Sequence, residues 1–160
     1  MLDLILISGT TYSGYAYSFT ADQEDIHIMR KWEGDDPGIN NQKTPTVLLL
    51  TPEQEFHSFG FTARDFYHDL QQREAKHWYF FEKFKMILHH NKVSVFSQIQ
   101  NPQVLLQTLG RSTMVKAANG VSLSAMKIFS ITLRYFRDHA IQELRDATGT
   151  KIGHVSEGRL

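Results

Sequence analysis

The stretch Gly9-Thr10-Thr11-Tyr12-Ser13-Gly14 connects two apolar segments near the start of the chain. Leu2–Ile7 precedes it as a short apolar run, and after it Tyr15, Tyr17 and Phe19 recur at every second position. A period of two is typical of a β-strand with one buried face, and small polar residues between two such runs are typical of a tight turn. The sequence therefore predicts a β-hairpin at the start of the domain.

Further strands are expected after the hairpin. The segment Ile26–Trp32 keeps a strand-like character, and residues 33–38 form a loop by composition. Val47–Leu50 is an apolar run followed by the turn residues Thr51-Pro52, which predicts another strand. These segments together predict a mixed sheet in the first third of the chain.

Helices are expected in the second half of the chain. From Thr62, a candidate N-cap, apolar residues recur at helical spacing to about residue 90, which predicts two helices with a break near residues 71–74. The clearest helix follows Ser122, a second candidate N-cap, and ends at Gly149. Between the helices only turns are predicted, at Asn101-Pro102, Gly110 and Asn119-Gly120. The fold class is thus α/β, more closely an α+β arrangement with a mixed sheet.

Composition limits the possible partners. The chain has 160 residues, the size of one domain, and its 41% hydrophobic content is enough for a packed core. Lys plus Arg and Asp plus Glu both number 17, so no overall field attracts the chain to nucleic acid or to an anionic membrane. Cysteine is absent, which removes disulfides and thiolate metal sites and favours an intracellular location. No run approaches the roughly 20 apolar residues that span a bilayer. We therefore expect no nucleic-acid partner and no membrane partner.

The turn at residues 9–14 has the residue types of an anion site. Glycine lets the main chain approach a ligand closely, and successive N–H groups form a concavity that can hold phosphate oxygens. Hairpin turns with small polar residues are nevertheless structural in most proteins, so the turn alone does not decide the function.

The sequence around this turn resembles a known family. Gly9-Thr10-Thr11-Tyr12-Ser13-Gly14 is similar to the first phosphate loop of the heat-shock 70-kilodalton chaperones and their actin-like relatives. Longer blocks resemble a divergent branch of that family, heat shock 70-kilodalton protein 12, without distinguishing its forms A and B. These blocks are Ser13–Phe19, Arg30–Gly34, Asn41–Pro45, Phe56–Gly60, Ala63–Leu70 and Phe81–Met86.

The resemblance implies a fold and a cofactor. The fold is the ribonuclease-H-like, actin-like ATPase domain, here an incomplete first lobe over residues 1–150, and the ligand is ATP with Mg²⁺. Gly9, Thr10, Thr11 and Tyr12 match the phosphate-contacting positions, and Arg64 matches a lysine near the γ-phosphate. The resemblance also implies a chaperone-type, stress-related protein of the cytoplasm, with the nucleus as a second location.

Two departures from the family pattern argue against full ATPase activity. The family places an aspartate that positions hydrated Mg²⁺ two residues before the loop glycine, where this chain has Ile7. The pattern also ends after Gly149, and residues 151–160 are expected to form a divergent, disordered tail without the second lobe. The hypothesis at this stage is a truncated or alternatively spliced product that hydrolyses ATP weakly or not at all. The alternative is a non-catalytic interaction or scaffold fragment that binds protein partners through its exposed interlobe surface.

Other candidate sites are interpreted as structural. The histidines show no pair with an acidic residue at zinc-site spacing, so no metal site is predicted. Asp65, Asp69 and Glu82 lie among Arg64, Lys83 and Lys85, which favours a solvated helical face over an acid–base pair. The aromatic run Trp78–Phe81 is interpreted as one helical turn that faces a core and a partner surface.

Overall fold

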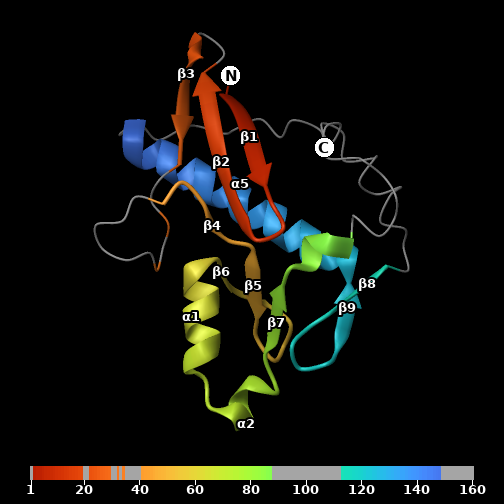
Figure 1. Ribbon diagram of the computed structural model, residues 1–160. Coiled ribbons are helices and arrows are strands. Elements are labelled where there is room, and N and C mark those ends of the chain that lie inside the picture. Colours follow the sequence, from red (N-terminus) through yellow and green to blue (C-terminus); the bar gives the residue numbers. More distant parts are fainter. Residues whose placement is uncertain are drawn as a thin grey trace.

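The structure is a computed structural model that describes residues 2–19, 22–29, 32, 34, 41–87 and 113–148. Within these ranges the chain forms nine strands, three α-helices and one short 3₁₀ helix, arranged as three small sheets and a long helix (Figure 1). The elements in chain order are β1 (Leu2–Ser8), β2 (Tyr12–Phe19), β3 (Asp22–Ile28), β4 (Thr44–Pro45), β5 (Val47–Leu50), β6 (Phe56–Phe59), α1 (Phe61–Asp69), α2 (Gln72–Ala75), β7 (Tyr79–Glu82), η1 (Phe84–Met86), β8 (Met114–Lys116), β9 (Ser122–Ser124) and α5 (Ala125–Thr148).

The predicted hairpin is confirmed. Strands β1 and β2 pair antiparallel from Leu2 opposite Phe19 to Ser8 opposite Ser13, and residues 9–11 form the turn between them. Strand β3 continues the sheet on the other side of β2, so the strand order is β1-β2-β3. Strand β4 pairs with the first two residues of β2 and thereby brings a later part of the chain beside the turn.

The predicted strand at Val47–Leu50 is also confirmed, but the predicted mixed sheet is not. Strand β5 is the central strand of a second sheet with the order β6-β5-β7, and β8 pairs with β9 in a third. Every ladder among the described strands is antiparallel. Several successive strands, such as β1 and β2, are joined by short turns, which antiparallel pairing allows and a parallel crossover does not.

The prediction of a helix from Trp78 to about residue 90 was wrong for its first half. Tyr79–Glu82 is strand β7, which pairs along its whole length with β5. Phe80 and Phe81 point to opposite faces of the sheet, yet their exposed fractions are only 6% and 0%. Because both faces are buried, the run lacks the polar–apolar alternation that identifies a strand, and the aromatic positions coincide with a helical spacing.

Neither predicted N-cap starts its helix. Helix α1 begins at Phe61, after Gly60, so Thr62 lies inside the first turn. Helix α5 begins at Ala125, whose N–H donates to the Thr113 carbonyl at 2.9 Å, while Ser122 belongs to β9. The predicted long amphipathic helix itself is confirmed over Ala125–Thr148.

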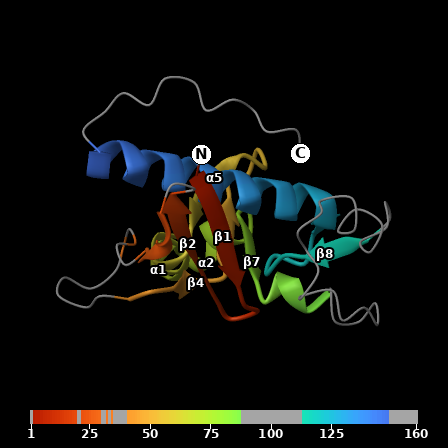
Figure 2. The same cartoon turned by 90° about the horizontal axis from the view of Figure 1, so that it is seen from above.

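Helix α5 provides one wall of the main core. It lies across the face of the first sheet (Figure 2), and one side of it also reaches the second sheet through buried aromatic residues. This core includes Tyr15 from β2, Leu48 from β5, Phe81 from β7 and, from α5, Ile128 and Phe136. The predictions for the loop at residues 35–38, the turns at residues 101, 102 and 110, the end of the helix at Gly149 and the tail at 151–160 lie outside the described residues.

Candidate phosphate-binding turn

The turn between β1 and β2 is held by hydrogen bonds to its carbonyl oxygens. The Gly9 N–H donates to the Tyr12 carbonyl at 2.9 Å, and the Thr46 N–H donates to the Thr11 carbonyl at 2.8 Å. The Thr46 hydroxyl donates to the Gly9 carbonyl at 3.0 Å. A side chain at position 9 would place its Cβ 2.7 Å from the Tyr12 oxygen, so this closure needs glycine. The turn therefore has a fixed shape with three of its carbonyls already engaged.

The N–H groups and hydroxyls of Thr10 and Thr11 differ from these carbonyls, because they have no hydrogen-bond partner among the described residues. Within the described part of the chain, neither residue donates a hydrogen bond through its N–H or its hydroxyl. Thr11 is exposed and Thr10 is partly exposed. Donors that are accessible, adjacent and fixed by a rigid turn form the kind of concavity that binds an anion.

A buried polar network lies beneath the turn. The Ser13 and Thr46 hydroxyls are 2.7 Å apart, and the ammonium of Lys85 donates to Ser13 Oγ at 2.6 Å. Lys85 comes from η1, is only 2% exposed, and burial lowers its pKa from the usual 10.5 to about 7. The interpretation of Lys85 as part of a solvated face was therefore wrong.

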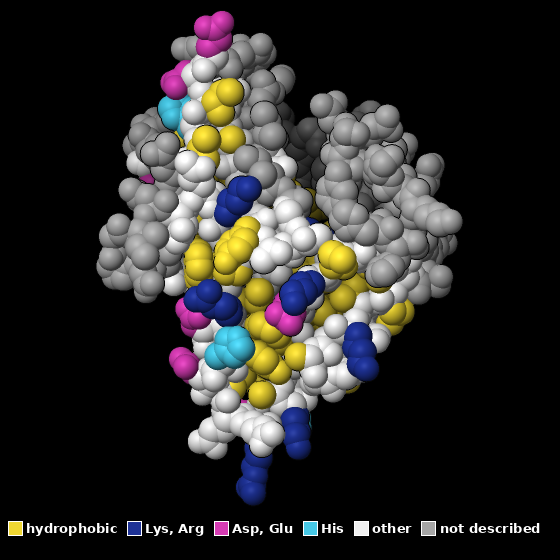
Figure 3. Space-filling view, viewed as in Figure 1, with side chains coloured by type: hydrophobic (Ala, Val, Ile, Leu, Met, Phe, Trp, Pro, Cys, Tyr) yellow, Lys and Arg dark blue, Asp and Glu magenta, His cyan; other side chains and the backbone are white. Residues whose placement is uncertain are grey.

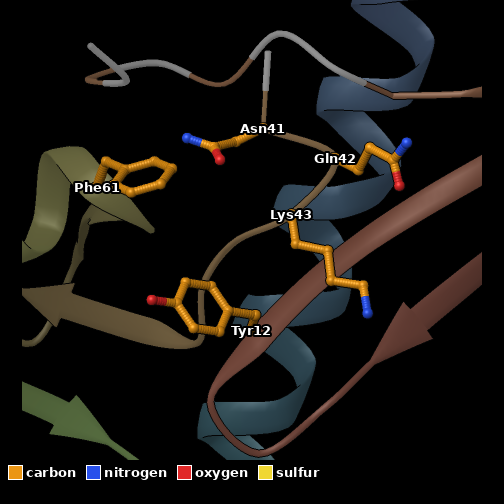
Figure 4. A pocket seen from close by; sticks show the side chains of 5 residues that line it. All are labelled: Tyr12, Asn41, Gln42, Lys43 and Phe61. Carbon is orange, nitrogen blue, oxygen red and sulfur yellow. The ribbon is translucent and has the colours of Figure 1, made fainter. Parts of the chain in front are cut away.

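A pocket of about 390 Å³ opens beside the turn (Figure 4). Its lining residues are Tyr12 from the start of β2, the segment 41–43 that leads into β4, and Phe61 at the start of α1. The side chains of Tyr12, Phe61 and Asn41 point toward one space, while those of Gln42 and Lys43 point away from it (Figure 4). The pocket thus offers two aromatic rings and one amide next to the candidate anion site.

Arg64 lies on α1, beside the pocket residue Phe61. Its guanidinium lies 5.1 Å from the ring centroid of Phe61, which lines the pocket. Its Nε also lies 2.7 Å from the carboxylate of Asp65, and the Arg64 side chain is 41% exposed. In this conformation the Nε–H of Arg64 donates to the Asp65 carboxylate, which partly neutralises the charge that a phosphate would meet.

Position 7, next to the turn, carries no carboxylate. Ile7, at the position where the family pattern has an aspartate, pairs with Gly14 in the β1–β2 ladder. Among the residues that the structure describes, no group of three or more His, Cys, Asp or Glu side chains could hold a metal ion.

None of the described helices combines the length and apolar character needed to cross a bilayer.

Comparison with curated proteins identifies relatives. The chain is 52% identical over 147 residues to heat shock 70 kDa protein 12A of Homo sapiens, a match that covers 90% of this chain and 19% of the relative. It is 53% identical over 138 residues to heat shock 70 kDa protein 12B of Homo sapiens, covering 86% of this chain and 18% of the relative. Over nearly its whole length, the chain is similar to one segment of the heat shock 70 kDa protein 12 proteins.

The similarity is to a limited segment of these relatives. The chain spans about a fifth of the length of the curated relatives that it matches, including protein 12A of Mus musculus at 52% identity over 145 residues. No family model matches the chain. No solved structure matches it either.

The structure brings only part of the predicted site together. The positions that resemble the heat shock 70 kDa phosphate loop, Gly9 to Tyr12, form the turn and the first residue of β2, and Arg64 lies on α1 beyond Phe61. Sequence reasoning missed Ser13, Thr46 and Lys85, which support the turn from below. For Lys85 the available signal was its place between Phe84 and Met86, but the assumed helix put it on an exposed face.

Proposed function

We propose that this segment binds ATP through the β1–β2 turn, with the phosphates held by the N–H groups and hydroxyls of Thr10 and Thr11. The observation that carries the proposal is a difference between the hydrogen-bond acceptors and the donors of the turn. Its carbonyls are engaged by the N–H of Gly9 and by the N–H and hydroxyl of Thr46, whereas the donors of Thr10 and Thr11 have no partner among the described residues. An anion is the ligand that such a set of donors favours.

The fold that we propose for the segment is the front part of the first lobe of an actin-like, ribonuclease-H-like domain. Similarity to the heat shock 70 kDa protein 12 proteins supports it, as does the antiparallel β1-β2-β3 sheet with a long helix across one face. In that arrangement the first hairpin turn is the phosphate loop, which agrees with the donors found there.

Each residue near the turn has a proposed part in nucleotide binding. Gly9 permits the tight closure, Thr10 and Thr11 donate to phosphate oxygens, and Tyr12 places its ring in the adjoining pocket. Arg64 is proposed as a charge clamp that exchanges Asp65 for a phosphate when nucleotide is present. Mg²⁺ would enter with ATP and neutralise phosphate charge, without a carboxylate at position 7 to orient its waters.

Hydrolysis is proposed to be weak or absent. Phosphoryl transfer depends on positioning and on charge neutralisation around the phosphate, and Ile7 contributes no ligand to hydrated Mg²⁺. Binding and turnover are therefore separate questions for this chain. Calorimetry measures the first, and release of inorganic phosphate measures the second.

The test of the proposal is titration of the purified chain and of three variants with Mg·ATP. Two of the variants introduce the same negative charge at different places, and the third removes a hydroxyl. Thr11→Asp places a carboxylate among the proposed phosphate donors and should abolish binding by repulsion. Ser122→Asp adds the same charge at an exposed position of β9 and should leave the affinity unchanged. Thr10→Ala removes one hydroxyl donor and should weaken binding about tenfold, as expected for a hydrogen bond to a charged group.

A folded wild-type chain that shows no saturable binding would refute the proposal. Equal binding by Thr11→Asp and wild type would place the nucleotide elsewhere. Circular dichroism of each variant establishes that the loss of affinity is not a loss of structure.

A second candidate function is protein binding without catalysis. Strand β3 lies at the end of the described sheet, and its Ile26 and Ile28 side chains are 58% and 40% exposed. Residues two apart on a strand share one face, so Ile26 and Ile28 lie on the same face of β3 as a short apolar row. At the end of the molecule where β3 lies, hydrophobic side chains are seen close to acidic ones (Figure 3). An apolar row at a sheet edge favours a partner strand or surface, and failure of the nucleotide titration would favour this second function.

A further inference from the structure

Lys85 is a charged side chain in an unusual place. It is 2% exposed, and its hydrogen-bond partner Ser13 is completely buried, as is Thr46 at 1% exposure. A buried lysine is costly, because removing an ammonium from water disfavours its charged form. That cost is seen in the pKa of Lys85, which burial lowers to about 7. A Met or Leu would fill the same space without this penalty, so the polar end of Lys85 needs an explanation.

The hydrogen bonds from Lys85 to the turn run in one direction. The Thr46 hydroxyl has a single proton, and it is donated to the Gly9 carbonyl, which can only accept. Thr46 Oγ1 must therefore accept from Ser13, whose own single proton is then used. Ser13 Oγ in turn accepts from the Lys85 amine. The result is an ordered chain of donors that begins at Lys85 and ends at the carbonyl of Gly9.

The end of this chain bears directly on the proposed anion site. The Gly9 carbonyl and the Thr10 N–H belong to the same peptide unit, which is planar and trans. A hydrogen bond that fixes the carbonyl therefore also fixes the direction of the N–H, which points the opposite way. Hydrogen bonds in series also polarise one another, so the Thr10 N–H becomes a stronger donor.

We propose that Lys85 is a positioning residue for nucleotide binding: through Ser13 and Thr46 it orients and polarises the Gly9–Thr10 peptide, whose N–H binds phosphate. The proposal rests on the proposed function, since it concerns the same turn. It adds a residue from η1, more than 70 positions along the chain from the turn, that does not touch the ligand itself.

The experiment uses the full chain, labelled with ¹⁵N, and measures two quantities for each variant. The first is the affinity for Mg·ATP by calorimetry, and the second is the amide resonance of Thr10 without ligand. Lys85→Met removes the first donor, and Thr46→Val removes the last hydroxyl at nearly constant shape. Thr46→Ser keeps that hydroxyl, and Lys83→Met removes an exposed lysine two positions from Lys85.

We expect Lys85→Met and Thr46→Val each to weaken binding about tenfold and to move the Thr10 amide resonance, since both break the same chain of donors. The double variant should therefore bind Mg·ATP no more weakly than either single variant, because mutations within one network are not additive. Thr46→Ser and Lys83→Met should retain wild-type affinity and an unshifted Thr10 resonance.

Two results would overturn the inference. One is wild-type affinity and an unmoved Thr10 resonance in a folded Lys85→Met or, if that variant does not fold, in Thr46→Val. The other is a loss of affinity in Thr46→Ser equal to that in Thr46→Val, which would indicate packing rather than the hydroxyl. If the wild-type chain binds no nucleotide, the proposed function fails, and the Thr10 resonance alone decides whether Lys85 orients the peptide.

Discussion

At the scale of single residues, two buried groups have shifted pKa values with opposite consequences for stability. Burial is the main cause that raises the pKa of the Tyr15 hydroxyl, which also donates to or accepts from His139 Nδ1 at 2.9 Å. Burial lowers the pKa of Lys85 to about 7. Tyrosine in an unfolded chain loses its proton only near pH 10. Of these two groups, Lys85 is therefore the one that makes the free energy of unfolding depend on pH between about pH 7 and pH 9.5.

The pH dependence that follows has a definite sign. Between pH 7 and pH 10.5 the unfolded chain keeps the proton on Lys85 while the folded protein has lost it. The unfolded state therefore binds more protons, and the free energy of unfolding increases with pH, by about 1 kcal/mol per unit. We expect the free energy of unfolding of wild type minus that of Lys85→Met to become more positive from pH 7 to pH 9.5. Urea denaturation at several pH values measures it, with Lys83→Met as a control that should show no such trend.

The predictability of the candidate site also differs from residue to residue. Gly9, Thr10, Thr11 and Tyr12 could be identified because a phosphate-binding turn is a local motif, contained in consecutive residues. Lys85 could not, since its importance depends on a contact with Ser13 across 72 positions of sequence. A lysine in an amphipathic pattern is normally solvated, and only the packing of η1 against β2 makes this one an exception.

At the scale of elements, local pattern predicted the hairpin, the β5 strand and the long helix. Each has a signal within its own residues: a period of two in β2, a continuous apolar run in β5, and a helical period over Ala125–Thr148. Strand β7 lacked such a signal because both of its faces are buried, one by residues of α1 that include Tyr67 and the other by the main core. Its state is decided by pairing with β5, which sequence spacing does not reveal.

The junction of β6 and α1 gives a prediction at this scale. Gly60 has φ 73° and ψ −136°, a conformation available almost only to glycine, and a Cβ there would collide with Thr44 Oγ1. The Thr44 hydroxyl also accepts from the Phe61 N–H at 3.3 Å, so the collision would disturb the start of α1. Gly60→Ala should therefore lower the free energy of unfolding by about 3 kcal/mol or more.

Gly120 provides the matched control for this substitution. Its φ is also positive, at 88°, but the nearest atom to an added Cβ is the end of the Lys116 side chain at 4.0 Å. Gly120→Ala should cost only the backbone strain of about 1 kcal/mol. Equal costs for the two glycines in denaturant unfolding would show that the contact with Thr44 is unimportant.

At the scale of the whole molecule, α5 joins the first two sheets into one core. The ring of Phe136, which is 2% exposed, packs edge-on against Tyr15 of the first sheet and Phe59 of the second, with ring centroids 6.3 and 5.2 Å away. Trp32 also lies against it at 6.1 Å. The turn and its supporting network stand between these sheets, since Ser13 belongs to one and Thr46 immediately precedes the other. The candidate site therefore depends on the two sheets remaining packed together.

This arrangement predicts that the two sheets unfold as one unit and that Phe136 couples them. The chain has two tryptophans, Trp32 near the first sheet and Trp78 beside His57 and Phe66 near the second, so replacing either with Phe leaves a reporter for the other region. In wild-type background both reporters should give the same denaturation midpoint. Phe136→Ala should lower stability by about 3–5 kcal/mol, whereas Leu133→Ala, at a side chain that is 45% exposed, should cost less than about 1 kcal/mol. If Phe136→Ala moved only the Trp32 midpoint, the second sheet would have a core of its own, and the turn would lie between two independently folding parts.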